Sequence, residues 1–311
     1  MYRVKDGILG LAVGDAMGMP TEFLERETLF EKPVLKMTPK ISTGIPKGAW
    51  GDNTSLTIAT MDAMSKSGLN YTAMADNFVR WFTSNHFCSI NESFGIGKTT
   101  LKALVRYTQR LDEAYECGSL ELKDNDNGSL KRMLPIAYYF VAHKETEKKI
   151  LEVVRRTSSI THANEEVVCG CYIYVRYAMN ILRGNNKFAA LEQIKGLDYK
   201  TFSKETQTKY KRILEGDLSK LSIDDIKTTD NVVDTLEATL WCFIHSSSYK
   251  ECVIATTNIG GDTDTIGALA GALAGLFYGY KSIPESMLEN LRKVDYLENM
   301  CEQFEFYLKR L

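Results

Sequence analysis

The feature that most constrains the fold is a charge-free segment of small residues near the C-terminal end of the chain. Residues 266–280 contain no charged side chain, and Gly267, Gly271 and Gly275 recur every four residues with alanines between them. Residues four apart share one face of a helix, so this face lets a second backbone approach closely. These fifteen residues are fewer than the roughly 20 that span a bilayer. We therefore predict a tightly packed central helix and no membrane association.

Helical periodicity dominates the remaining chain, and strand-like alternation is scarce. We expect an opening helix that ends near Gly18 and a second helix that starts at Asp52. The spacing predicts further helices over 71–84, 99–111, 131–142, 146–158, 167–182, 188–193, 232–243, 249–257, 266–280 and 285–311. Residues 172–175 fit a helix or a strand, and the polar stretch 196–231 is interpreted as a surface excursion. A single compact all-α domain over residues 1–311 is favoured over two domains.

Charge and cysteine content restrict the partners and the compartment. The formal net charge is −2, which gives no electrostatic surface for nucleic acid. Seven cysteines are an odd number, and no secretory signal precedes Gly7. These features predict a reduced, cytoplasmic protein. They do not indicate its oligomeric state.

The sharpest local motif is Gly-Gly-Asp-Thr-Asp-Thr-Ile-Gly at 260–267. Two carboxylates two residues apart point to different sides of a regular helix, but a glycine turn before the helix lets Asp262 and Asp264 converge. Carboxylate and hydroxyl oxygens suit Mg²⁺, Mn²⁺ or Ca²⁺ better than zinc. The alternative is a helix N-terminus in which one of these aspartates is a cap. The residues alone leave both interpretations open.

Other polar turns carry weaker signals. Asp52 follows Gly51 at a helix start, and Asp15 precedes a turn that contains Glu22; each acid is also explained as a cap or turn residue. The segment 93–100 lacks the first glycine of a P-loop. Its Gly95 and Gly97 still precede a helix, where backbone N–H groups can meet a phosphate.

Taken together, the motifs resemble the ADP-ribosylglycohydrolase family, which includes the dinitrogenase reductase activating glycohydrolases and the ADP-ribosyl-acceptor hydrolases. The resemblance spans nearly the whole chain in family order. It rests on the segments GLAVGDAMG at 10–18 with Pro20 and Glu22, GAWGDNTSLT at 48–57, NGSLKRMLP at 127–135, Thr161-His162, DTLEATLW at 234–241, and the run at 260–267.

The resemblance implies an all-α fold with an acidic cleft that holds two divalent cations, Mg²⁺ or Mn²⁺. By position, it implies metal ligands at Asp52, Asn53, Asp262, Asp264 and Thr265, and catalytic roles for Asp52, Asn53, Asp262 and Glu22. It implies an ADP-ribose cleft lined by Gly95, Ile96, Gly97, Asn127, Gly128, Ser129 and His162. The expected reaction is metal-assisted hydrolysis of the C1″ bond that joins ADP-ribose to a protein or small-molecule acceptor.

Two departures from the family pattern stand out. Gly51 replaces a hydroxyl residue, and Asn53 replaces an aspartate. An amide oxygen can bind a cation, but it carries no charge and cannot take a proton. Asn53 fits a change made to trap substrate, a natural variant with different chemistry, or a relative that binds without catalysis. We therefore expect a metal-dependent ADP-ribosyl hydrolase that Asn53 weakens or inactivates; the alternative is a non-catalytic ADP-ribose-binding or interaction module.

Overall fold

The computed structural model describes residues 3–109 and 112–311, and it confirms the predicted all-α fold. The described residues form isolated β-bridges but no sheet. The helices of nine or more residues are α1 (Val4–Gly18), α3 (Asp52–Ser67), α4 (Tyr71–Ser84), α5 (Lys98–Thr108), α6 (Leu134–Ala142), α7 (Glu147–Ser158), α8 (Glu165–Leu182), α9 (Lys187–Lys195), α12 (Val232–His245), α13 (Tyr249–Thr257), α14 (Thr263–Tyr278) and α16 (Val294–Leu308). The shorter helices are α2 (Arg26–Glu31), α10 (Lys204–Lys209), α11 (Lys211–Leu214) and α15 (Glu285–Asn290).

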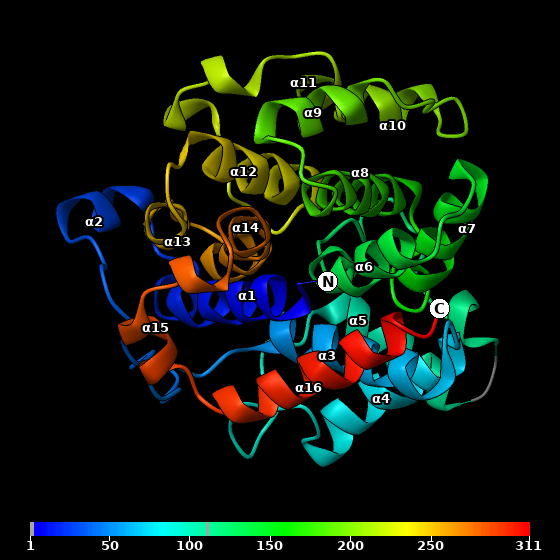
Figure 1. The fold of residues 1–311 in the computed structure, drawn as a ribbon, viewed down its shortest axis with the longest axis horizontal. Coiled ribbons are helices and arrows are strands. Elements are labelled where there is room, and N and C mark those ends of the chain that lie inside the picture. Colours follow the sequence, from blue (N-terminus) through cyan, green and yellow to red (C-terminus); the bar gives the residue numbers. More distant parts are fainter. Residues whose placement is uncertain (1–2, 110–111) are drawn as a thin grey trace.

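Helices α1 and α14 form the centre of the molecule, and glycines make their close contact possible (Figure 1). A Cβ built on Gly10 would lie 2.4 Å from the carbonyl oxygen of Gly271. A Cβ on Gly14 would lie 1.9 Å from the carbonyl oxygen of Gly267, and one on Gly275 would lie 2.1 Å from that of Asp6. The predicted small-residue face of α14 therefore packs directly on the backbone of α1.

A methyl group at this contact is expected to destabilise the protein. Gly14→Ala should lower the free energy of unfolding by about 3 kcal/mol, because the neighbouring atom is backbone and cannot rotate away. Urea unfolding followed by circular dichroism measures the change. Gly196→Ala is the matched control, since its Cβ would meet atoms no closer than 3.7 Å, and it should change the stability by less than about 0.5 kcal/mol. Equal stability of the two variants would contradict this account of the core.

The other helices surround this pair on several sides. Helices α8 and α12 lie on one side of it, with α9, α10 and α11 outside them, and α3, α4 and α16 lie on the opposite side (Figure 1). The ambiguous stretch 172–175 belongs to α8. The segment 196–231 contains α10 and α11 and buries Tyr210 and Leu218 completely. The segment is therefore more than a surface excursion, because some of its side chains are part of the hydrophobic core.

The C-terminal part departs from the predicted helix over 285–311. Helix α15 ends at Asn290 and α16 begins at Val294. Lys293 between them has a φ of 55°. The backbone N–H of Arg292 donates to the carbonyl of Gly48 at 2.9 Å, and the indole N–H of Trp50 donates to the carbonyl of Arg292 at 2.9 Å. These two hydrogen bonds at the break between α15 and α16 hold the loop that leads into α3.

Most other predicted bounds agree with the structure to within a few residues. The helix expected over 131–142 is a 3₁₀ turn, Leu130–Arg132, followed by α6. The last two positions of the helix expected over 99–111 lie outside the described residues. Helix α2 lies within the loop before Trp50, where no helix was expected.

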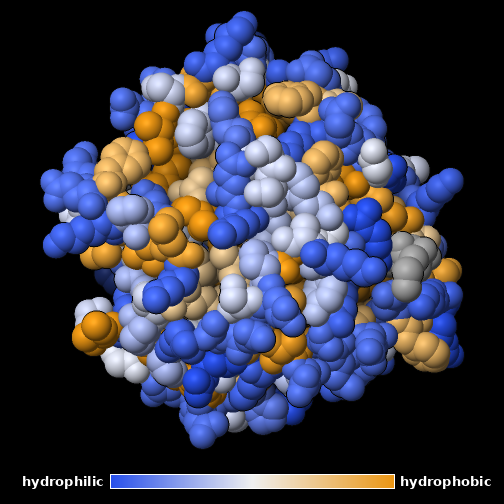
Figure 2. Space-filling model, turned by 60° about the vertical axis from the view of Figure 1, so that its left-hand side comes forward, coloured by the Kyte–Doolittle hydropathy of each residue, from blue (hydrophilic) through white to orange (hydrophobic). Residues whose placement is uncertain are grey.

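The molecular surface mixes polar and apolar residues. Figure 2 shows a face on which hydrophobic residues lie in small groups separated by hydrophilic ones, as is usual for a protein surface. In the described part of the chain, no helix combines the length and the apolar character that crossing a bilayer requires.

Candidate active site

The N-terminal end of α14 meets the C-terminal end of α1, and hydrogen bonds fix the two loops there. The hydroxyl of Thr263 donates to the carbonyl of Gly18 at 2.9 Å, and the hydroxyl of Thr21 donates to the carbonyl of Thr257 at 2.7 Å. Gly260 and Gly261 have φ values of 83° and 71°, which glycine adopts without strain. A Cβ on Gly261 would lie 2.1 Å from the carbonyl oxygen of Thr228. The glycine turn is therefore required by both conformation and space.

This arrangement gathers three carboxylates at one point. Oxygen atoms of Glu22, Asp262 and Asp264 all lie within 4.8 Å of one another, and we call these residues the acidic triad. Asp264 Oδ1 is buried and finds no hydrogen-bond donor among the described residues. Converging carboxylate oxygens with an unpartnered lone pair are what a hard divalent cation needs. The triad therefore fits a cation such as Mg²⁺ or Mn²⁺.

The side chain of Asp262 has a role other than capping a helix. Asp262 stands at the N-cap position of α14, yet its carboxylate makes no capping hydrogen bond. Instead Asn127 Nδ2 donates to Asp262 Oδ2 at 2.5 Å. The backbone N–H of Asp262 donates to the carbonyl of Thr228 at 2.8 Å. The geometry favours the converging-carboxylate interpretation of this motif over the capping alternative.

A second group of polar residues starts α3. The N-cap of this helix is Gly51, so Asp52 and Asn53 lie within its first turn. The buried carboxylate of Asp15 accepts from the backbone N–H of Gly51 at 3.1 Å and from the hydroxyl of Thr54 at 2.6 Å. Asp15 thus holds the start of α3 against α1. A Cβ on Gly51 would lie 2.8 Å from Met19 Cε, which shows that Met19 fills part of the space that a larger residue needs.

Crowding and burial make these carboxylates costly to keep ionised. Burial raises the pKa of Asp15 to about 7, and the charge of Asp264 adds to the rise. Burial also raises the pKa of Glu22 to about 7, where Asp264 adds to it and Lys40 opposes it. For Asp262, burial and Asp264 raise the pKa well above its ordinary value. A bound cation would relieve this repulsion.

Two lysine side chains reach the site, and the sequence motifs indicate neither of them. Lys40 forms an ion pair with Glu22. Lys131 Nζ lies 2.7 Å from Asp52 Oδ2, and both side chains are almost fully buried. Burial raises the pKa of Asp52 to about 6 even though Lys131 opposes the rise. Burial lowers the pKa of Lys131, but Asp52 and Asp264 outweigh it, so the net shift is upward.

The acidic triad opens into a cleft of about 460 Å³. Of the catalytic, metal-ligating and substrate-binding residues expected from the sequence, those that line this cleft are Glu22, Asp52, Gly95, Ile96, Gly97, Asn127, Gly128, Asp262, Asp264 and Thr265. Lys98, Lys102 and Lys123 also line it. Lys98 and Lys102 belong to α5, so they place positive charge on the side of the cleft where this helix begins. Asp124, Asp126 and Asp230 line it as well, so the cleft has an acidic end and a wall that carries both lysines and aspartates.

Ser129 and His162, which were expected to line the cleft, lie behind its wall. Both are fully buried. His162 Nε2 lies 2.8 Å from Asp126 Oδ1, and Asp126 lines the cleft. Burial would raise the pKa of Asp126, but hydrogen bonds from His162 and Thr99 outweigh it and lower the pKa. Ser129 pairs with Ser158 at 2.8 Å. These residues support the wall from behind.

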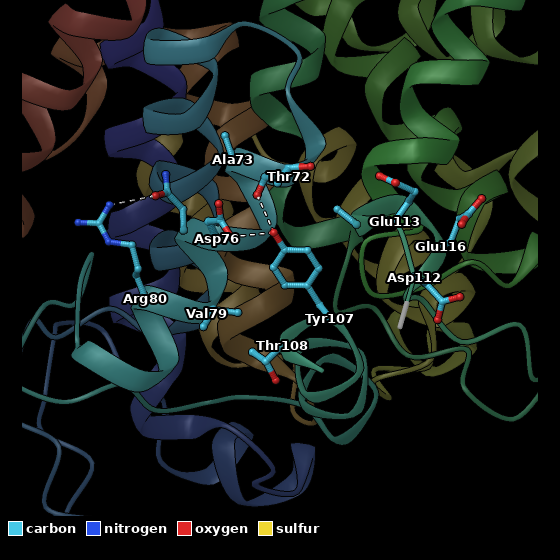
Figure 3. A pocket seen from close by; sticks show the side chains of 12 residues that line it. Thr72, Ala73, Asp76, Val79, Arg80, Tyr107, Thr108, Asp112, Glu113 and Glu116 are labelled. Carbon is cyan, nitrogen blue, oxygen red and sulfur yellow. Dashed lines mark hydrogen bonds between the residues drawn. The ribbon is translucent and has the colours of Figure 1, made fainter. Parts of the chain in front are cut away.

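A larger cavity of about 1140 Å³ lies elsewhere, between α4, α5 and the segment 112–116 (Figure 3). At its centre the hydroxyl of Tyr107 donates to Asp76 Oδ1 at 2.7 Å. Asp112, Glu113 and Glu116 line one side, but acids at an open surface do not by themselves make a site. The smaller cleft gathers buried, perturbed carboxylates, so it is the better candidate for chemistry.

A groove of about 640 Å³ adjoins the cleft at its mouth. Phe23 and Asp230 line both the groove and the cleft. The groove also carries the acids Glu25, Glu27 and Asp224 and the aromatic ring of Phe30. A cationic group that extends from the cleft would meet acids and aromatic faces there.

The all-α fold and the acidic cleft define a helical protein built around a potential divalent-cation site. The chain belongs to the ADP-ribosylglycohydrolase family, whose sequence profile matches residues 1–310. It is 26% identical to the "ADP-ribosylarginine hydrolase Tri1" of Serratia proteamaculans, over 98% of this chain and 79% of that protein. It is 28% identical to the "ADP-ribosyl-[dinitrogen reductase] glycohydrolase" of Rhodospirillum rubrum, over 93% of this chain and 90% of that protein.

A solved structure shows the same fold. The "ADP-ribosylglycohydrolase-related protein complex" superposes with a TM-score of 0.81 and 26% sequence identity, over 99% of this chain and 98% of that one. The resemblance inferred from the motifs is therefore confirmed at the level of family and fold.

Proposed function

We propose that this chain is a metal-dependent hydrolase that removes ADP-ribose from an acceptor by cleaving the C1″ glycosidic bond. The observation that carries the proposal is the convergence of Glu22, Asp262 and Asp264 in a cleft that is also lined by lysines. ADP-ribose has the complementary pattern, with ribose hydroxyls at one end and a diphosphate beside them. Family membership supports the same activity.

The described residues fit a divalent cation at the acidic triad. Glu22, Asp262 and Asp264 would hold it, with Thr265 lining the cleft beside them. When bound, such a cation orients ribose hydroxyls and makes water a better nucleophile at neutral pH. Mg²⁺ and Mn²⁺ are the ions that this oxygen donor set favours. The expectation of two cations stays untested.

The chain's own residues supply the remaining chemistry. Glu22 is the most exposed of the triad, with 17% of its side chain accessible, so it is best placed to exchange a proton with water or the leaving group. Asn127 orients Asp262 through its amide N–H. Asn53 has no proton-accepting group, so it does no acid–base work, and its Nδ2 donates to Asp264 and Asp15. This division of roles assigns general acid–base work to a carboxylate at the cleft mouth.

We assign the diphosphate of ADP-ribose to the start of α5. Gly97 is the N-cap of this helix, where free backbone N–H groups favour an anion. Lys98 and Lys102 follow on the same helix and line the cleft. The backbone N–H groups and the two lysines therefore offer donors to an anion at one place, beside the carboxylate of Asp126, which accepts a hydrogen bond from Thr99.

Gly97→Glu is expected to weaken ADP-ribose binding by about 10²-fold, because a carboxylate beside the diphosphate repels it. The protein should tolerate the side chain, since a Cβ on Gly97 meets only Asp126 Oδ1, at 3.8 Å. Isothermal titration calorimetry with ADP-ribose measures the effect. Gly97→Gln separates bulk from charge and should weaken binding less. Unchanged affinity of Gly97→Glu would show that the diphosphate binds elsewhere.

Arginine is the acceptor that we propose. The groove at the cleft mouth presents acids and aromatic rings to whatever extends from C1″, and a guanidinium group suits such a surface. Two relatives, at 26% and 28% identity, are named ADP-ribosylarginine hydrolases. Both observations favour arginine over an uncharged acceptor.

The test is release of free ADP-ribose from mono-ADP-ribosylated arginine and serine peptides, measured by mass spectrometry with Mg²⁺ or Mn²⁺ present. We expect release from the arginine peptide and none after chelation of the metal. Binding of ADP-ribose without release from either peptide would favour the alternative, a binding module on the same fold.

A further inference from the structure

Lys131 occupies an unusual position for a lysine. It lies in the 3₁₀ turn Leu130–Arg132, and only 8% of its side chain is exposed. The hydroxyl of Thr57 on α3 donates to its carbonyl at 3.1 Å. Arg132 fixes the other side of the turn by donating to the carbonyl of Thr157 at 3.0 Å. These two hydrogen bonds fix the backbone of the turn, and the side chain of Lys131 lines the acidic cleft.

A buried ammonium is costly unless a charge partner compensates it. Here Lys131 Nζ lies 2.7 Å from Asp52 Oδ2. This carboxylate stands in the first turn of α3, within the same cleft as Asp262 and Asp264. The ammonium thus takes an oxygen that a cation at this end of the cleft would need.

The neighbouring residue turns its amide N–H group towards two of the acids, while its buried Oδ1 has no hydrogen-bond partner among the described residues. Asn53 Nδ2 donates to Asp264 Oδ2 at 3.0 Å and to Asp15 Oδ1 at 3.3 Å. A carboxylate at position 53 would instead add a negative charge beside these two acids. The amide and the ammonium together lower the negative charge at this end of the cleft.

The two ends of the cluster therefore differ in what they can bind. The acidic triad offers converging carboxylate oxygens, whereas the Asp52–Asn53 end offers an uncharged amide oxygen and one carboxylate already paired with an ammonium. We propose that the ammonium of Lys131 takes the place of a second divalent cation, so that this chain binds one divalent ion at the acidic triad. The inference rests on the proposed function for the existence of that cation site, and it differs from the two ions that the family resemblance implies.

The arrangement has a physical consequence. A lysine carries one positive charge, is covalently attached and is not removed by a chelator. Asp52 therefore keeps its counter-charge in the metal-free protein, while the triad depends on added metal. A second divalent ion at Asp52 would also be repelled by the adjacent ammonium.

The number of Mn²⁺ ions bound per chain tests this inference without any enzymatic assay. Equilibrium dialysis with metal analysis, together with electron paramagnetic resonance, should give one magnetically isolated Mn²⁺ for the unaltered protein. The Lys131→Met/Asn53→Asp variant should bind two ions as a coupled pair. Its second site should be at least about 10²-fold tighter than any second site of the parent, because a repelling charge is removed and a ligand charge is added.

Lys102→Met is the matched control, since it removes a lysine from the outer wall of the same cleft, and it should still bind one ion. Two coupled ions in the unaltered protein would overturn the inference, because Lys131 would then move aside for the second metal. A double variant that folds, by its circular dichroism spectrum, and binds only one ion would overturn it as well.

The result is distinguishable from failure of the proposed function. One ion without release of ADP-ribose would leave the inference standing and remove the hydrolase proposal. Release of ADP-ribose by a protein that binds two ions would do the reverse.

Discussion

Asp262→Asn/Asp264→Asn is expected to abolish tight binding of a divalent cation and to lower ADP-ribose release by roughly 10³-fold. Both carboxylates belong to the acidic triad. A metal ion contributes several kcal/mol of charge stabilisation to a transition state, and each 1.36 kcal/mol corresponds to about tenfold in rate. Asparagine keeps the size of each side chain and removes its charge. The change is measured as kcat/KM for release of ADP-ribose and as Mn²⁺ affinity by calorimetry.

The control for this pair removes two acids from the larger cavity instead. Asp76→Asn/Asp112→Asn makes the same change in net charge at residues that line the cavity near Tyr107. It should leave metal affinity and rate within about twofold, a change of less than 0.5 kcal/mol. If this control lost activity while Asp262→Asn/Asp264→Asn kept it, the larger cavity would be the active site.

Lys131→Met/Asn53→Asp is expected to raise kcat by about 10²-fold. The change removes the ammonium from Asp52 and adds a carboxylate that faces Asp15 and Asp264. A carboxylate at position 53 can bind a second cation or accept a proton from water, and general acid–base groups contribute about 10²–10⁴-fold. Both effects act mainly in the transition state, so KM should change less than kcat. Single-turnover and steady-state rates with the arginine peptide measure them.

The single variants divide this effect. Asn53→Asp alone should raise kcat less than the double variant, because Lys131 can still neutralise the new carboxylate. Lys131→Arg keeps the charge and should not raise kcat at all. Equal rates for the parent and the double variant would show that neither residue limits the reaction. Hydrolysis of these acceptors would then lose support relative to a binding module or a different substrate.

The tightly packed central helix could be predicted because its signal is local, whereas the identity of its partner, α1, could not. Gly267, Gly271 and Gly275 recur at helical spacing, and close packing is the ordinary use of such a face. The convergence of Asp262 and Asp264 was one of two interpretations that the local sequence allowed, since a Gly-Gly turn precedes them but a capping aspartate fits the same residues. The break at Lys293 could not be predicted, because it depends on a hydrogen bond between Arg292 and Gly48, which are distant in sequence.

Lys131 shows what local patterns miss. In the sequence it stands beside Arg132 in an ordinary basic pair, and only the folded structure brings it to Asp52. Ser129 and His162 illustrate a related point. The motifs place them next to cleft residues in the sequence, but in the structure both side chains are fully buried and neither lines the cleft, and His162 contacts Asp126. A sequence motif groups residues that are adjacent along the chain, but only some of these residues have side chains that reach the cleft.

The most direct test of the account is a crystal structure of the unaltered protein with Mn²⁺ and ADP-ribose. We predict one Mn²⁺, located by its anomalous signal, on oxygens of Glu22, Asp262 and Asp264, with Lys131 still paired to Asp52. The ribose that carries C1″ should lie over this ion, and the diphosphate should lie against Gly97 at the start of α5. ADP-ribose bound in the larger cavity near Tyr107, or in the cleft with no Mn²⁺ at the acidic triad, would contradict the account.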